Sequence, residues 1–159
     1  MAGWQGTAHC PLPTAHCHLY IAADVKTYDP VTFEVDAERI RQYADAVHED
    51  NPVYHDAEAA KEAGFRDLVA PPMFAVVYSA SAMGPPIMET IGDGLPRMVH
   101  GGQEFVWGEP VCAGDTITTQ ASVKEIFERD GKTFYIFESV SKNQEGEEVV
   151  RATWTNIVR

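Results

Sequence analysis

Apolar residues between Ile40 and Val47 recur three and four positions apart, which is the spacing of one face of a helix. Asp36 precedes this segment and is a residue type that caps helix N-termini, so a helix is predicted to begin after it. A second short helix is predicted over residues 57–63, with Asp56 as its cap. Both helices have polar positions opposite the apolar ones, and therefore one face of each is expected to meet solvent.

A third helix is predicted over residues 73–83, where almost every position is apolar or small. A helix without a polar face is expected to be buried on all sides, so Tyr78 and Met83 are predicted to be core residues. The helix should stop at Gly84-Pro85-Pro86, because proline has no N–H and its ring disturbs the preceding turn.

The pattern changes to strands from residue 98 onward, where β-branched and aromatic residues dominate. Asp130-Gly131 and Glu145-Gly146 are typical of tight hairpin turns. Four strands are therefore predicted, over residues 98–108, 116–128, 132–144 and 147–158.

This order of helices followed by long antiparallel strands indicates the α+β class, with the sheet wrapped around the apolar helix. That arrangement is the hot-dog fold. A chain of 159 residues suits one such domain, which we expect to span residues 28–159. Long sheet edges need cover, so a dimer is also expected.

Residues 1–27 show no clear period and are interpreted as a tail or leader of uncertain order. The segment contains Cys10 and Cys17 beside histidines, which are ligand types for soft metals. Because it also carries prolines and no periodic pattern, we predict no metal site there.

The formal net charge of -12 argues against a nucleic-acid partner, which requires a surplus of lysine and arginine. No apolar stretch is long enough to span a membrane, and three cysteines form no disulfide framework. We therefore expect a cytoplasmic protein with no membrane partner. The same acidity opposes polyanionic ligands unless another chain supplies positive charge.

The segment from Tyr43 to Met73 reads YADAVHEDNPVYHDAEAAKEAGFRDLVAPPM. It resembles the region of MaoC-like R-specific enoyl hydratases that carries SGDxNPxHxD, AxxxGF and IAHGM. Downstream, HGGQEF at residues 100–105 and PVCAGDT at 110–116 resemble the strand and the AGD turn of the same group. The likeness covers residues 28–159. It is closest to the FAS1-like, or MaoC N-terminal, dehydratase domains of the mycobacterial-type (3R)-hydroxyacyl carrier-protein dehydratases.

The resemblance implies an acyl-CoA or acyl-carrier-protein thioester as substrate and no cofactor. The family uses an aspartate, a histidine and a backbone N–H at the start of the buried helix. In this sequence Glu49 stands at the aspartate and Tyr54 at the histidine, while Pro71-Pro72 replaces His-Gly before Met73. A phenol with a pKa of about 10 is a poor base near neutrality, and proline offers no N–H to an oxyanion.

These departures predict a subunit that shapes the substrate channel while a catalytic MaoC-like partner performs hydration or dehydration. Substrate-binding roles are predicted for Asn51, Tyr54, Pro72, Met73 and His100. The alternative to a catalytic MaoC-like partner is a homodimer. Two alternative functions stay open: an autonomous hydratase that uses Glu49 with His55, and a non-enzymatic acyl-thioester binding module. Four basic residues are candidates to meet coenzyme A phosphates: Lys61, Arg66, Lys124 and Arg129.

Overall fold

The computed structural model describes residues 19–21 and 26–159. Most of the segment interpreted as a tail, including Cys10 and Cys17, lies outside these residues. Three of its residues do form a strand, β1 (Leu19–Ile21), which pairs with the far end of β4. None of the helices in the described ranges is long and apolar enough to cross a membrane.

After the short strand β2, the remaining elements follow one another in two groups, first helices and then long strands. In chain order they are β2 (Val31–Glu34), α1 (Ala37–Ala46), the 3-10 turn η1 (Pro52–Tyr54), α2 (Ala57–Glu62), η2 (Pro72–Phe74), α3 (Ala75–Ile91), η3 (Gly92–Arg97), β3 (Met98–Trp107), β4 (Thr116–Arg129), β5 (Lys132–Lys142) and β6 (Glu148–Val158). The four long strands match the predicted ranges to within two residues.

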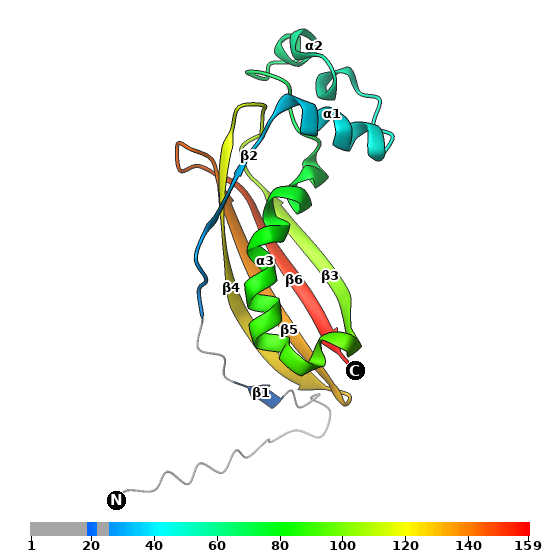
Figure 1. Ribbon diagram of the computed structural model, residues 1–159, viewed down its shortest axis with the longest axis vertical. Helices are drawn as coiled ribbons and strands as arrows, with labels where there is room; N and C mark the ends of the chain where they lie inside the picture. The colour runs from blue at the N-terminus through cyan, green and yellow to red at the C-terminus, as the bar shows by residue number, and fades with distance from the viewer. Residues whose placement is uncertain (1–18, 22–25) are drawn as a thin grey trace, which may run out of the picture.

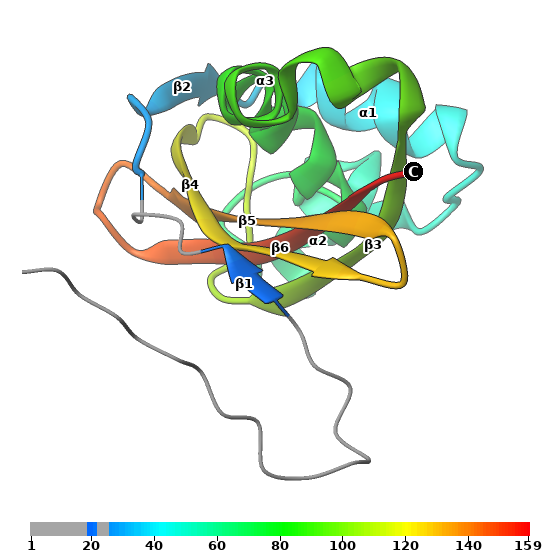
Figure 2. The ribbon, with the colours of Figure 1, turned by 90° about the horizontal axis from the view of Figure 1, so that it is seen from below.

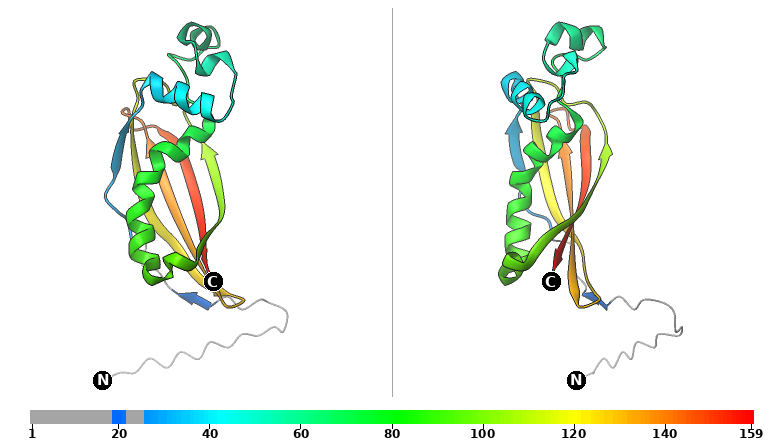
Figure 3. Two further views of the ribbon diagram at one scale, coloured as in Figure 1. Left: turned by 45° about the vertical axis from the view of Figure 1, so that its right-hand side comes forward. Right: turned by 90° about the vertical axis from the view of Figure 1, so that its right-hand side faces the viewer.

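The strands form one six-stranded antiparallel sheet in the order β1-β4-β5-β6-β3, with β2 paired to β4 beside this path. Helix α3 runs along one face of the sheet, and α1 and α2 gather at one end of the molecule (Figure 1). Figure 2 shows the sheet curving beneath α3, and Figure 3 shows that no helix of the described residues covers its opposite face. The predicted α+β class and hot-dog architecture are therefore confirmed.

Local capping chemistry defines the starts of α1 and α2. The carboxylate of Asp36 accepts a hydrogen bond of 2.8 Å from the N–H of Arg39, and that of Asp56 accepts one of 3.0 Å from Glu58. Each bond satisfies an N–H that the first helical turn leaves without a partner. Both caps confirm the sequence prediction.

Helix α3 differs from the prediction in its end point. It continues through Gly84-Pro85-Pro86 as far as Ile91. The prolines remove backbone hydrogen bonds, but Pro86 is buried, and Ile87 and Ile91 pack in an apolar cluster with the sheet. This burial offsets the lost bonds, so the predicted stop at residue 84 is wrong.

The expectation that α3 is buried on all sides is also wrong. Met73, just before the helix, Val77 and Met88 are 47%, 37% and 63% exposed. Phe74, Tyr78 and other residues of this segment belong to the core.

Strand β3 forms one end of the sheet. It pairs with β6, and no strand of the described chain occupies its other edge. Val106 and Trp107 near its end are 65% and 48% exposed, and the ring of Trp107 stacks on Phe105 with centroids 4.8 Å apart.

The amide of Asn156 on β6 is 2% exposed, and its Nδ2 has no hydrogen-bond partner among the described residues. We expect Asn156→Leu to raise the free energy of unfolding by about 1 kcal/mol, because a buried unpaired donor carries a desolvation cost of about 1–3 kcal/mol. Thr119→Val is the matched control, since the Thr119 hydroxyl lies 2.7 Å from that of Ser141. This control should lose about 1 kcal/mol in the same urea titration. A destabilised Asn156→Leu protein would contradict the prediction.

Candidate active site

A short connecting segment brings the start of α3 against the loop between α1 and α2. The N–H of Val69 donates to the carbonyl of Val53 in η1, at 3.3 Å. The N–H of Ala70 donates to Val111, at 2.8 Å, and Val69 forms an isolated bridge with Cys112. The two prolines that follow Ala70 are thereby held between η1 and the turn before β4.

Asp115 stabilises that turn from inside the protein. Its carboxylate is fully buried and accepts hydrogen bonds from the N–H of Cys112, at 2.8 Å, and from Nε2 of Gln144, at 3.1 Å. The guanidinium of Arg66 forms an ion pair with the same carboxylate, and this bond raises the pKa of Arg66 above its ordinary value. A buried charge with this set of partners is compensated and fixes the surrounding backbone.

A cavity of about 490 Å³ opens where these segments meet. Its walls come from η1, the end of α2, the start of α3 and the end of β3, and most lining groups are apolar. The polar side chains on its walls belong to Asn51, Tyr54, Tyr78, Trp107 and Glu109. A mostly apolar cavity with a few polar groups is the usual form of a small-ligand site.

Three of the predicted site residues, Asn51, Tyr54 and Pro72, line this cavity. Asn51 is fixed by its side-chain oxygen, which accepts a hydrogen bond of 3.3 Å from the N–H of Val53. Burial, and secondarily the charge of Glu49, raise the pKa of Tyr54. Tyr54 therefore stays a protonated phenol near neutral pH.

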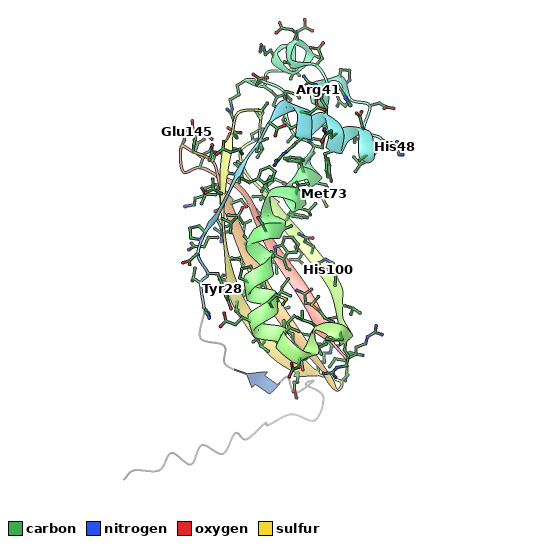
Figure 4. The ribbon with its side chains drawn as sticks, viewed as in Figure 1. Tyr28, Arg41, His48, Met73, His100 and Glu145 are labelled. Atoms are coloured by element: carbon green, nitrogen blue, oxygen red, sulfur yellow. The ribbon has the colours of Figure 1, made fainter. Side chains whose placement is uncertain are left out.

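Glu49, His55, Met73 and His100 are not among the lining residues. Nε2 of His55 donates a hydrogen bond of 2.7 Å to the backbone carbonyl of Glu49, and Nδ1 lies 3.8 Å from the carboxylate of Asp45. The imidazole thus serves to hold its own loop. Figure 4 shows Met73 at the end of α3 nearest α1, whereas His100 lies farther along the sheet.

The prolines decide which backbone donors the start of α3 can offer. Pro71 and Pro72 line the cavity and carry no N–H. The N–H of Phe74 donates to the carbonyl of Pro71, at 2.9 Å, and that of Ala75 donates to Pro72. The first remaining amide belongs to Met73, which lies outside the cavity lining.

Sequence reasoning did not assign Tyr78, Trp107 and Glu109 to the site. Tyr78 is a core residue, as predicted, but it also lines the cavity. Trp107 and Glu109 flank Gly108 in the turn that follows β3. The glycine lets the backbone of this turn lie close to that of β6, because a Cβ at this position would lie 2.0 Å from the carbonyl oxygen of Glu148. Nothing in the local sequence indicates that this turn reaches the start of α3.

The family model for the FAS1-like, dehydratase domain region matches residues 24–152. A UPF0336 protein of Streptomyces coelicolor is 38% identical over 135 residues, which cover 84% of this chain and 89% of that protein. A UPF0336 protein of Thermobifida fusca is 35% identical over 131 residues, which cover 82% and 86%. The chain belongs to the FAS1-like dehydratase domain family.

Solved structures place this FAS1-like dehydratase domain among MaoC-like folds. The truncated HadBC (3R-hydroxyacyl-ACP dehydratase) complex of Mycobacterium tuberculosis is similar, with a TM-score of 0.75 and 28% identity; the match covers 87% of this chain and 99% of that one. The (R)-hydratase of A. caviae involved in PHA biosynthesis shares the fold, with a TM-score of 0.66, 18% identity and coverage of 87% and 98%. The resemblance to MaoC-like proteins is thereby confirmed.

The basic side chains of the FAS1-like dehydratase domain that were candidates for phosphate binding are all paired with carboxylates. Arg66 is bound to Asp115 as described, and the others form three further ion pairs: Lys61 with Glu58, Lys124 with Glu138, and Arg129 with Asp130. No lysine or arginine of the described residues lines the cavity. The described residues of this chain therefore place no cation at the cavity that could bind a polyphosphate.

Proposed function

We propose that this chain is the substrate-channel subunit of an R-specific enoyl-thioester hydratase or 3-hydroxyacyl-thioester dehydratase in cytoplasmic fatty-acyl metabolism. The cavity at the start of α3 holds the acyl thioester, carried by coenzyme A or by a carrier protein. A MaoC-like partner chain supplies the acid–base pair.

The observation that carries this proposal is the chemistry of the cavity wall. Pro71, Pro72 and Tyr54 line the cavity. By the resemblance to MaoC-like hydratases, the prolines occupy the positions that supply the N–H, and the phenol of Tyr54 occupies that of the base. The walls are otherwise mostly apolar and fit an acyl chain. A site with suitable shape and without these groups is suited to bind the substrate of a reaction that another chain performs.

Charge supports a heteromeric assembly. A chain of net charge -12 whose candidate cations already pair with carboxylates attracts neither coenzyme A nor an acidic carrier protein. A partner with free basic residues completes the phosphate site. The HadBC dehydratase, which is similar to this chain, was solved as a complex, and this supports the same kind of pairing here.

The autonomous hydratase with Glu49 and His55 is the weaker candidate. It requires both side chains to face the substrate, whereas the imidazole of His55 donates to a backbone carbonyl of its own loop. A purely binding module remains the outcome if no partner confers activity. The channel subunit and the binding module differ in one measurable property. Only the channel subunit supports turnover when it is assembled with a partner.

A substitution that fills the cavity tests its assignment to the acyl chain. Ala63 is exposed and lines the cavity, so Ala63→Trp should lower the affinity for a decanoyl-pantetheine thioester by about tenfold or more, the effect of roughly 1–3 kcal/mol of overpacking. Ala46→Trp, at an exposed position outside the cavity lining, is the matched control. Affinities are measured by calorimetry. Equal affinities for Ala63→Trp and the wild type would refute the assignment.

A further inference from the structure

Tyr78 presents a polar group on the α3 wall of the cavity. The residue is 2% exposed and belongs to the main core cluster. Its ring meets that of Phe74 edge-on, with centroids 6.2 Å apart and an interplanar angle of 63°. Because Phe74 is itself buried, the tyrosine ring has little freedom to move.

The hydroxyl of Tyr78 is unpaired within the part of the chain that the structure describes. Among the described residues none forms a hydrogen bond with it, and it is not among the side-chain atoms that are both fully buried and unpaired. The small exposed part of Tyr78 therefore includes the hydroxyl. Since Tyr78 lines the cavity, this oxygen faces the cavity.

The geometry of a helix directs the hydroxyl toward the prolines. Side chains on a helix lean toward its N-terminus and cover the turn before their own Cα. Tyr78 lies six residues after Pro72 in the chain, and its ring packs against that of Phe74, which lies four residues nearer the helix start. Tyr78 and the two prolines, which provide no backbone donor, line the same cavity.

The hydroxyl is also in the right protonation state. Burial raises the pKa of Tyr78 well above the ordinary value for tyrosine. The group remains a neutral donor throughout the pH range in which thioesters are stable, and it adds no negative charge beside the carbonyl oxygen of a ligand.

We propose that the Tyr78 hydroxyl donates a hydrogen bond to the thioester carbonyl oxygen of the bound acyl group, in place of the amide that Pro71 and Pro72 lack. This inference rests on the proposed function, because it takes the cavity to be the acyl-thioester site. It makes Tyr78 a substrate-binding residue that distinguishes a carbonyl from a plain alkyl chain.

The test compares two ligands of the same length, decanoyl-pantetheine as the thioester and decyl-pantetheine as the thioether that lacks the carbonyl oxygen. Tyr78→Phe removes only the hydroxyl. It is expected to weaken thioester binding on the order of tenfold, and to change thioether binding less than about twofold. Calorimetry on the full chain gives the four affinities of a double-mutant cycle.

Tyr43→Phe is the matched control. Tyr43 also packs edge-on against Phe74, with centroids 5.4 Å apart, but it does not line the cavity. Its variant should bind both ligands as the wild type does. Equal losses for thioester and thioether, or no loss, would overturn the role of Tyr78 alone. Failure of the wild-type chain to bind either ligand would overturn the assignment of the cavity, and the role of Tyr78 with it.

Discussion

The isolated chain is expected to hydrate a crotonyl thioester at least about 10³-fold more slowly than the same chain assembled with a catalytic hot-dog partner. Loss of one oxyanion donor typically costs about 10²–10³ in rate, and loss of a positioned base costs about 10²–10⁴. Under the proposed function, Pro72 and Tyr54, which both line the cavity, stand in place of these two groups. The expected ratio is therefore a lower bound.

Absorbance of the enoyl thioester, followed with the chain alone and co-purified with a MaoC-like chain, measures this ratio. In the assembled protein, Glu49→Gln and His55→Gln should change the rate by less than about twofold, because neither side chain lines the cavity and the amide of glutamine can replace the imidazole as donor to the carbonyl of Glu49. Turnover by the isolated chain that either substitution abolishes would instead establish the autonomous hydratase.

Asp115→Ala is expected to lower the free energy of unfolding by about 3–5 kcal/mol. The substitution leaves the buried N–H of Cys112 without an acceptor, and deprives Arg66 and Gln144 of their common partner. Removing one member of a buried, hydrogen-bonded charge pair typically has an effect of about this size. Affinity for acyl thioesters should fall as well, since the bridge from Cys112 to Val69 positions the segment before the prolines.

Urea denaturation of three variants checks this prediction. Asp115→Asn keeps an acceptor for the N–H of Cys112 but loses the charge, so its loss of stability should lie between zero and that of Asp115→Ala. Asp93→Ala, at an exposed position, should stay within about 0.5 kcal/mol of the wild type. A loss below about 1 kcal/mol for Asp115→Ala would show that the turn is held by other contacts.

Features governed by neighbouring residues could be predicted from the sequence. Asp36 and Asp56 cap helices through bonds to amides two and three residues away. Asp130 and Gly131 adopt positive φ values of 51° and 69°, which set the β4–β5 hairpin. In each case the chemistry that decides the structure lies within a few residues of the pattern that predicts it.

Features governed by distant packing could not be predicted in the same way. Helix α3 passes Pro85 and Pro86 because the sheet buries its second half, and no local pattern reports that burial. Tyr78 lines the cavity because α3 meets η1 and the turn after β3. Likewise, Tyr54 lines the cavity and His55 does not, and both residues belong to the 3-10 turn η1 and its end. The sequence near Pro52 predicts only a break in the helix at this point.

The free edge of β3 has a consequence for the amount of this protein that a cell can hold. Its row of backbone donors and acceptors has no strand neighbour in the described chain, and such an edge accepts almost any extended polypeptide. If the partner chain of the proposed function covers this edge, copies made in excess of that partner are exposed to aggregation. We then expect cells to match production of this chain to that of its partner, or to degrade the surplus.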